Sequence, residues 1–106
     1  MLLLEPDAER RATMTRMLRA SGISVTAVSR IAEIERWPVG EVAIVDAAWF
    51  TPWWITMGVS HIVVQVDTPE EGAALCARGA ARWINRRADP KDVVSTLLAV
   101  AEGTTV

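Results

Sequence analysis

Five short runs of apolar residues alternate along the chain with longer segments in which apolar residues recur three and four positions apart. The runs are almost continuously apolar, a texture typical of strands that are covered on both faces of a parallel sheet. They occupy residues 2–4, 23–28, 42–45, 61–66 and 83–85. We therefore predict five buried strands, each joined to the next by a crossover segment.

Helix signals fill the segments between these strands. The patterns predict helices over residues 8–20, 69–78 and 90–102, and a short helix over residues 31–35. Gly22 and Gly79 follow the first two long helices, where glycine favours a helix C-terminus. Asp89 and Pro90 together are typical of a helix start. Strands alternating with helices predict an α/β fold, a doubly wound five-stranded parallel sheet in one domain that spans residues 1–106.

The first predicted helix is amphipathic. Met14 and Leu18 lie on its apolar stripe, which we expect to face the core. The helix also carries four arginines, which we expect on its solvated face. They are Arg10, Arg11, Arg16 and Arg19.

Polar residues collect where the predicted strands end. Ligand sites of doubly wound sheets lie outside the carboxyl ends of the strands. Here those ends carry Glu5, Asp7 and Asp46, together with residues 65–67 and 85–87. Acids and arginines that are distant in the sequence should therefore meet at one edge of the sheet.

Residues 47–66 contain no acidic or basic side chain, and a stretch of that length is about long enough to cross a membrane. Pro52, Gly58 and the change from a Trp-rich to a Val-rich half argue instead for a connection followed by a strand. Only fourteen residues separate Asp46 from His61, so we predict that the third helix is short or missing.

The Trp-rich half of this stretch contains four large aromatic residues. They are Trp49, Phe50, Trp53 and Trp54. Two interpretations stay open for them. They fill the core in place of the missing helix, or they form a docking or dimer surface, since large aromatic side chains are enriched at interface anchors.

Composition narrows the classes of function. The net charge is −2, and the cations are ten arginines and one lysine, which argues against direct binding of nucleic acid. Cys76 is the single cysteine and no secretory signal pattern is present, which favours a cytoplasmic location without membrane attachment. A doubly wound fold can also carry an unrelated small-molecule site, but we find no phosphate-cradling glycine loop, nucleophile–base pair or metal motif to support one. We do not expect an enzyme.

Three stretches in order resemble the receiver domain of two-component response regulators. Residues 2–7, Leu-Leu-Leu-Glu-Pro-Asp, look like its first strand and acidic pair, and residues 42–46, Val-Ala-Ile-Val-Asp, look like the strand that presents the phospho-accepting aspartate. Residues 79–87, followed by Asp89 and Pro90, look like the stretch around its fifth strand. The resemblance covers nearly the whole chain and implies the flavodoxin-like, receiver-like order of strands.

The resemblance also implies roles for individual residues. Asp46 takes the phosphoacceptor position, and Glu5 the first of two acidic positions that bind Mg²⁺ with it, with Asp7 as a replacement for the second. Arg86 takes the position of the family's lysine, and Trp83 that of its switching aromatic residue.

Several positions depart from the family's pattern. Pro6 stands at the second acidic position, and Gln65 or Val66 stands where a small hydroxyl residue should hold a phosphoryl oxygen. Arg86 replaces a compact ammonium with a rigid fork, and Arg87 replaces a proline. A fork at this position is expected to reach Asp46.

Two functions follow. The first is a degenerate receiver-like signalling module, independent of phosphorylation and without a cofactor, that works through contacts with a protein partner, a fused output domain or a second copy in a homodimer. The alternative is a functional phosphoacceptor that uses Asp46 with Mg²⁺ held by Glu5 and Asp46, served by a sensor kinase.

Overall fold

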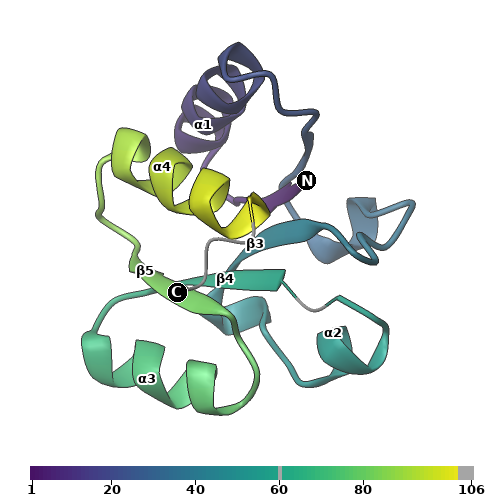
Figure 1. Ribbon diagram of the computed structural model, residues 1–106, viewed down its shortest axis with the longest axis vertical. Helices are drawn as coiled ribbons and strands as arrows, with labels where there is room; N and C mark the ends of the chain where they lie inside the picture. Colours follow the sequence, from purple (N-terminus) through teal and green to yellow (C-terminus); the bar gives the residue numbers. More distant parts are fainter. Residues whose placement is uncertain (60, 103–106) are drawn as a thin grey trace.

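The computed structural model describes residues 1–59 and 61–102. They form a five-stranded parallel sheet with the strand order β2-β1-β3-β4-β5 (Figure 1). The strands are β1 (Leu2–Leu4), β2 (Thr26–Val28), β3 (Val42–Asp46), β4 (His61–Val66) and β5 (Arg82–Asn85). This topology confirms the predicted five-stranded parallel sheet.

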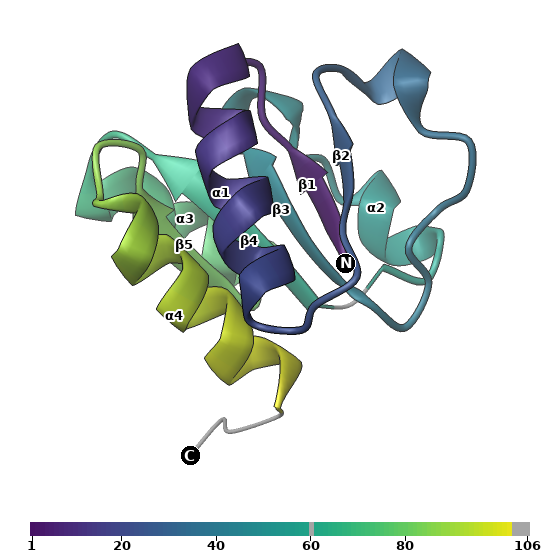
Figure 2. The same cartoon turned by 90° about the horizontal axis from the view of Figure 1, so that it is seen from above.

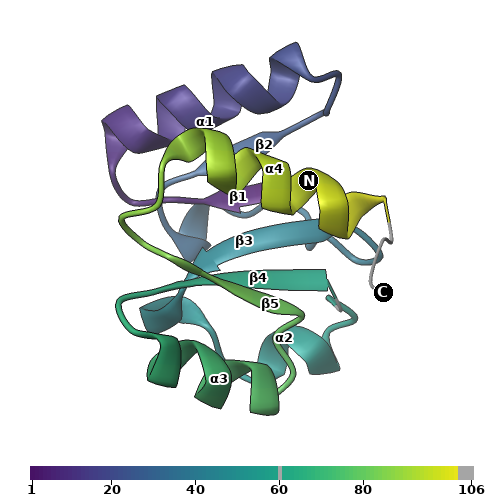
Figure 3. The same cartoon turned by 60° about the vertical axis from the view of Figure 1, so that its left-hand side comes forward.

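Helices cover both faces of the sheet, as a doubly wound fold requires (Figures 2 and 3). One face carries α1 (Ala8–Ala20) and α4 (Pro90–Ala101), and the other carries α2 (Trp53–Thr56) and α3 (Pro69–Ala77). Single 3-10 turns stand at Ile31–Glu33 and Ala47–Trp49. In the part of the chain that the structure describes, none of the helices has the length and apolarity needed to cross a membrane.

The three long helices begin where their sequences provide a side-chain cap. Side-chain oxygens of Asp7, Thr68 and Asp89 each accept a hydrogen bond from a backbone N–H in the first turn of α1, α3 and α4, respectively. Pro69 and Pro90 stand in the first turns of α3 and α4, where the absence of an N–H removes no hydrogen bond. Local sequence therefore fixes where these helices start.

The second strand is shorter than the apolar run over residues 23–28 predicts. Only Thr26–Val28 pairs with β1, because the chain before it is still closing the end of α1. The Ile23 N–H donates to the Leu18 carbonyl at 3.1 Å, and Gly22 takes a φ of +83°. The first half of the predicted strand is therefore wrong.

The helix predicted over residues 31–35 is also wrong in extent. It is reduced to the single 3-10 turn Ile31–Glu33, because the backbone at Ile34 is already extended. By contrast, α2 has only four residues, which confirms the shortened third helix that the spacing between Asp46 and His61 predicts.

Each face of the sheet has its own core. Beneath α1 and α4, alternate strand residues such as Leu3, Ile44 and Val63 pack against Met14 and Leu97, and all five are fully buried. Hydrophobic burial of this kind is the main force that holds α1 and α4 on the sheet.

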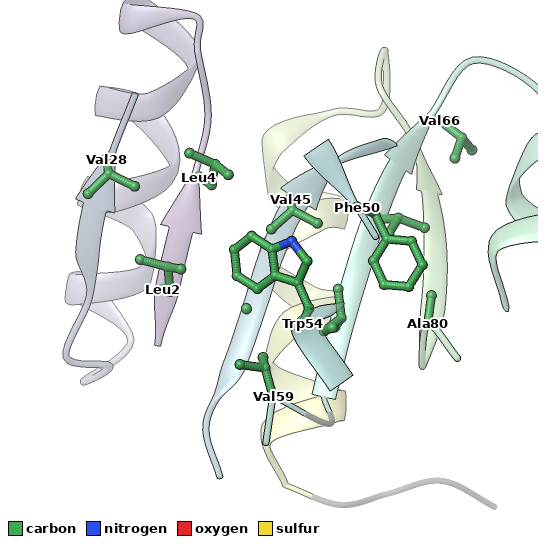
Figure 4. Close-up of a cluster of buried hydrophobic side chains, with 12 residues drawn as sticks. Leu2, Leu4, Val28, Val45, Phe50, Trp54, Val59, Val66 and Ala80 are labelled. Atoms are coloured by element: carbon green, nitrogen blue, oxygen red, sulfur yellow. The ribbon is translucent and has the colours of Figure 1, made fainter. Parts of the chain in front are cut away.

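On the opposite face, Trp54 takes the place of the longer helix. It lies over β3, near Val45, Phe50 and Val59 (Figure 4), and is 1% exposed. Its ring Nε1 donates to the Trp49 carbonyl at 3.0 Å, so the polar atom of the indole is satisfied while the ring is buried. One tryptophan thus supplies the core volume that a regular helix would provide.

The four aromatic residues of this segment differ in burial. Phe50 and Trp54 belong to the core, so a place for them in an exposed interface is wrong. Trp49 is half-buried against the same core. Trp53 remains 49% exposed, with its ring edge-on to Trp37 at a centroid distance of 4.7 Å.

Candidate functional site

The carboxyl ends of β1, β3 and β4 lie next to one another. Asp46 is the register partner of Gln65, and Leu3 pairs with Ile44, which brings Glu5 to the same edge as Asp46. Arg86 directly follows β5, which pairs with β4. The sheet thus gathers residues from four segments at the edge where the sequence predicts the site.

A first network surrounds Glu5, which is 5% exposed. The Gln65 Nε2 donates to Glu5 Oε1 at 3.1 Å, and the Asp7 backbone N–H donates to Glu5 Oε2 at 3.2 Å. Arg10 Nε lies 3.2 Å from Glu5 Oε1, and its other nitrogens donate to the Ala88 carbonyl at 3.1 Å and to Gln65 Oε1 at 3.3 Å. Both oxygens of the buried carboxylate are therefore engaged.

A second network surrounds Asp46. Arg86 forms a fork with it, Nε to Oδ2 at 2.9 Å and Nη2 to Oδ1 at 3.0 Å, and the Ala48 N–H also donates to Oδ1 at 3.0 Å. The third nitrogen, Nη1, donates to Asp67, and Nη2 reaches the Gln65 carbonyl at 3.4 Å. Two parallel N–H···O bonds are the strongest arrangement that arginine and carboxylate can form.

The protonation of Arg86 reflects this setting. Its hydrogen bond to Asp46, followed by that to Asp67, raises the pKa of Arg86 above its usual value, against the opposing effect of desolvation. The guanidinium therefore stays charged beside Asp46.

These contacts test whether the residues fit Mg²⁺, which the receiver fold implies. Mg²⁺ requires several free oxygen ligands in octahedral geometry. Here the oxygens of Asp46 are bonded to Arg86, those of Glu5 face Arg10 and Gln65, and Pro6 has no side-chain oxygen. Within residues 1–59 and 61–102, no cluster of three metal-ligating side chains is found. The arrangement does not fit the ion.

Asp7 does not join the two other acids. Its carboxylate accepts a hydrogen bond from the Arg10 backbone N–H at 2.9 Å, and the residue is exposed at the start of α1. The expectation that it replaces the missing acidic ligand is therefore wrong in this arrangement, because helix capping determines where its oxygen points.

Trp83 lies on β5 with its ring against α3. A side chain at Gly72 would collide with the ring, so the absence of a Cβ there makes room for the indole. Trp83 remains 38% exposed. It therefore presents part of a large rigid ring at the surface next to the Arg86 network.

Arg10, which was expected on the solvated face of the first helix, instead belongs to the Glu5 network. A signal was present, because Arg10 stands four positions before Met14 and eight before Leu18, both fully buried. A charged residue on that stripe needs a buried partner of opposite charge, and Glu5 is that partner. Gln65 was considered only as a substitute for a hydroxyl residue, whereas its amide joins Glu5 to Arg10.

Comparison with solved structures shows the same fold in response regulators. The receiver domain of the Francisella response regulator 1452 superposes with a TM-score of 0.76 at 10% identity, covering 98% of this chain and 97% of that one. An orphan response regulator of H. pylori gives 0.76 at 15% identity, covering 94% and 93%. An atypical orphan response regulator, described as having a new phosphorylation-independent regulatory mechanism, gives 0.75 at 16% identity, covering 95% and 93%.

No protein-family model matches the sequence, and a search of curated proteins finds no match. The evidence for the receiver fold, which extends over nearly the whole chain, is the similarity to these solved structures.

Proposed function

We propose that this chain is a receiver-like signalling module that works through protein contacts and does not depend on phosphorylation of Asp46. The observation that carries the proposal is the fork between Arg86 and both oxygens of Asp46. A carboxylate must present a free oxygen to attack a phosphoryl group. Because both oxygens of Asp46 are bonded to the charged Arg86 side chain, neither is free for this attack.

The surroundings of Asp46 support the same conclusion. Phosphoryl transfer depends on cations positioned around the transferred group, and Mg²⁺ is the usual one. Pro6 and the engaged Glu5 offer little to such an ion, and the Gln65 side chain is occupied by Glu5 and Arg10. The positive charge of Arg86 neutralises Asp46. The polar groups at this edge of the sheet are therefore paired without a metal ion or a phosphoryl group.

Contacts with a partner have a surface to use. Four exposed hydrophobic residues lie on or beside α2, a set that we call the α2 patch: Val39, Trp53, Ile55 and Met57. Val39 borders the turn at Gly58, which directly follows the patch residues of α2. Trp83 offers a second exposed ring on β5. Large exposed apolar side chains that gather in this way are typical of protein interaction sites.

A solved relative supports the idea of signalling without phosphorylation. The atypical orphan response regulator with a TM-score of 0.75 is described as phosphorylation-independent. That protein shows that a receiver fold is compatible with such a mode, and the Arg86 fork gives this chain a physical reason to use it.

The experiment is incubation with Mg²⁺ and acetyl phosphate, followed by intact-mass analysis, with Asp46→Asn as the control. We expect no phosphorylated species and, in a parallel titration with beryllofluoride, unchanged backbone NMR signals around Asp46. A phosphorylated species that disappears in Asp46→Asn would overturn the proposal and establish the phosphoacceptor alternative, in which a sensor kinase is the partner.

The contact surface is tested by light scattering of the protein beside Trp53→Ala, with Trp83→Ala as a matched exposed-ring control. Loss of self-association in Trp53→Ala alone, with far-UV circular dichroism retained, identifies the α2 patch as a homodimer surface. A monomer in all three samples excludes the homodimer and leaves a different protein, or a fused output domain, as the partner.

A further inference from the structure

A groove lined by arginines runs along α1. Figure 2 shows that α4 lies on one side of α1 and β2 on the other. The groove lies between the helix and β2, the edge strand of the sheet, and has a volume of about 510 Å³. Of the seven residues that line it, three are arginines and none is acidic: Arg11, Arg16 and Arg19. This volume is within the range of small-molecule sites.

Helical spacing places the three arginines on one face. Arg19 follows Arg16 by three positions and Arg11 by eight, so it lies between them around the helix, and all three side chains line the same groove. Ala12 and Thr15 lie between the arginines, and Ala27 of β2 closes the far side. Because these three side chains are small, the space between the guanidinium groups stays open.

Two of the three arginines are oriented without being neutralised, and Arg16 is exposed to solvent. Arg11 Nη1 donates to the Glu5 carbonyl at 2.9 Å, and Arg19 Nη2 donates to the Val25 carbonyl at 3.3 Å. Carbonyl groups are neutral, so they hold the forks in place and leave the charges uncompensated. Among the described residues, neither these two nor Arg16 forms a salt bridge, in contrast to Arg10 and Arg86.

We propose that this groove binds a small molecule with two adjacent phosphate groups, of the nucleoside diphosphate class. Guanidinium forks match phosphate oxygens in pairs. Arg16 and Arg19 are three residues apart, about 4.5 Å along the helix axis, which suits neighbouring phosphates, and Arg11 lies about 12 Å from Arg19. The remaining length and the small side chains leave room for a planar ring, on which a guanidinium can stack.

A long polyanion fits the chain less well. The overall charge is −2, so the chain as a whole does not attract a long polyanion. A compact ligand that concentrates its charge on two phosphates makes the best use of three arginines. The proposal is independent of the state of Asp46, because the groove shares no lining residue with the Asp46 network.

Isothermal titration calorimetry of the whole chain tests the proposal with ADP, pyrophosphate and AMP at low salt. We expect ADP and pyrophosphate to bind and AMP to bind about tenfold more weakly, since it lacks the second phosphate. Arg16→Ala and Arg19→Ala should each weaken ADP binding about tenfold. Arg78→Ala removes an exposed charge beyond α3, on the opposite face, and should leave binding unchanged.

A further variant tests whether the ligand occupies the groove, and it leaves the charge of the groove unchanged. Ala12→Leu places a larger side chain on the exposed floor of the groove, where leucine is a good helix former, and should weaken ADP binding at least fivefold. Backbone NMR shifts on ADP addition should concentrate on α1 and β2.

Three results would overturn the proposal. They are the absence of binding by ADP and pyrophosphate at millimolar concentration, equal losses in Arg78→Ala and Arg16→Ala, and ADP binding that is unaffected by Ala12→Leu. Tighter binding of a glutamate-rich peptide than of ADP would also overturn it, because it would identify an acidic protein segment as the occupant. ADP and pyrophosphate binding equally would support the diphosphate chemistry and assign the source as inorganic diphosphate.

Discussion

The two arginine–carboxylate networks at the carboxyl end of the sheet use the same functional groups in different surroundings. In the first, the side chains of Arg10 and Glu5 are 17% and 7% exposed, and Gln65 bridges them. In the second, Arg86 and Asp46 are 34% and 14% exposed, and Asp67, at 65%, extends into solvent. An ion pair that water can reach contributes little to stability. Removal of one partner from a buried pair is strongly destabilising, because it leaves the other charge buried and unpaired.

This difference assigns separate tasks to the networks. The Glu5–Arg10 pair holds the start of α1 against the sheet, because each group would be an uncompensated charge without the other. Water can reach the Asp46–Arg86 pair, so we expect that either residue can be replaced without loss of the fold. Asp46 is therefore restrained by the weaker of the two networks.

Removal of Arg10 is the change with the largest expected effect. Arg10→Ala leaves the buried Glu5 carboxylate without its cation and should lower the free energy of unfolding by about 3 kcal/mol. Urea denaturation followed by circular dichroism measures this, with Arg16→Ala, an exposed arginine of the same helix, as the control. A loss in Arg10→Ala no larger than in Arg16→Ala would show that the Glu5 network does not support the fold.

Removal of Arg86 should have an intermediate effect. Arg86→Ala breaks the fork to Asp46, yet water can reach both groups, so we expect a loss of about 1.5 kcal/mol in the same denaturation experiment. Arg86→Lys should recover only part of it, because an ammonium cannot form the two parallel hydrogen bonds. If Arg86→Ala destabilises the protein as much as Arg10→Ala, the distinction between the networks fails.

Removal of the charge on Asp67 should have the smallest effect. Asp67→Asn loses an exposed ion pair and should change the free energy of unfolding by less than about 0.5 kcal/mol at low salt. The difference should vanish in 1 M NaCl, where screening acts over about 3 Å, while the effect of Arg10→Ala persists. A salt-insensitive loss in Asp67→Asn would mean that the outer part of the Asp46 network is less accessible to water than its exposure indicates.

The parts of the site that lie at strand ends could be predicted, and the parts that reach it from elsewhere could not. Asp46 and Arg86 directly follow or end apolar runs, and a parallel sheet brings such positions together whatever the side chains are. Arg10 belongs to a helix, where its direction depends on how α1 rotates on the sheet. The spacing of Arg10 from Met14 and Leu18 indicates that it faces inward, but only the packing of α1 on the sheet brings it against Glu5.

The Trp-rich segment shows a similar limit. Its length was enough to predict a short or missing helix, because fourteen residues cannot form two loops and a full helix, and α2 has four residues. Which tryptophan is buried was not predictable, since Trp53 and Trp54 are neighbours with the same side chain. Packing against β3 and the bond from Trp54 to the Trp49 carbonyl decide it.

The sequence by itself determined the succession of strands and helices along the chain, because this depends on apolar periodicity, capping residues and segment length. It also determined that the sheet is parallel, and therefore at which edge the polar residues collect. The pairing of Arg86 with Asp46 was expected from the sequence, whereas only the tertiary structure decided that Arg10 is paired and that the other arginines of α1 are not. Arg10 and Arg86 find carboxylates, whereas Arg11, Arg16 and Arg19 on the same chain find only carbonyl groups or solvent. The physical reason is that the energy of a charge depends on distance and on access to water, and both are fixed only when the elements pack.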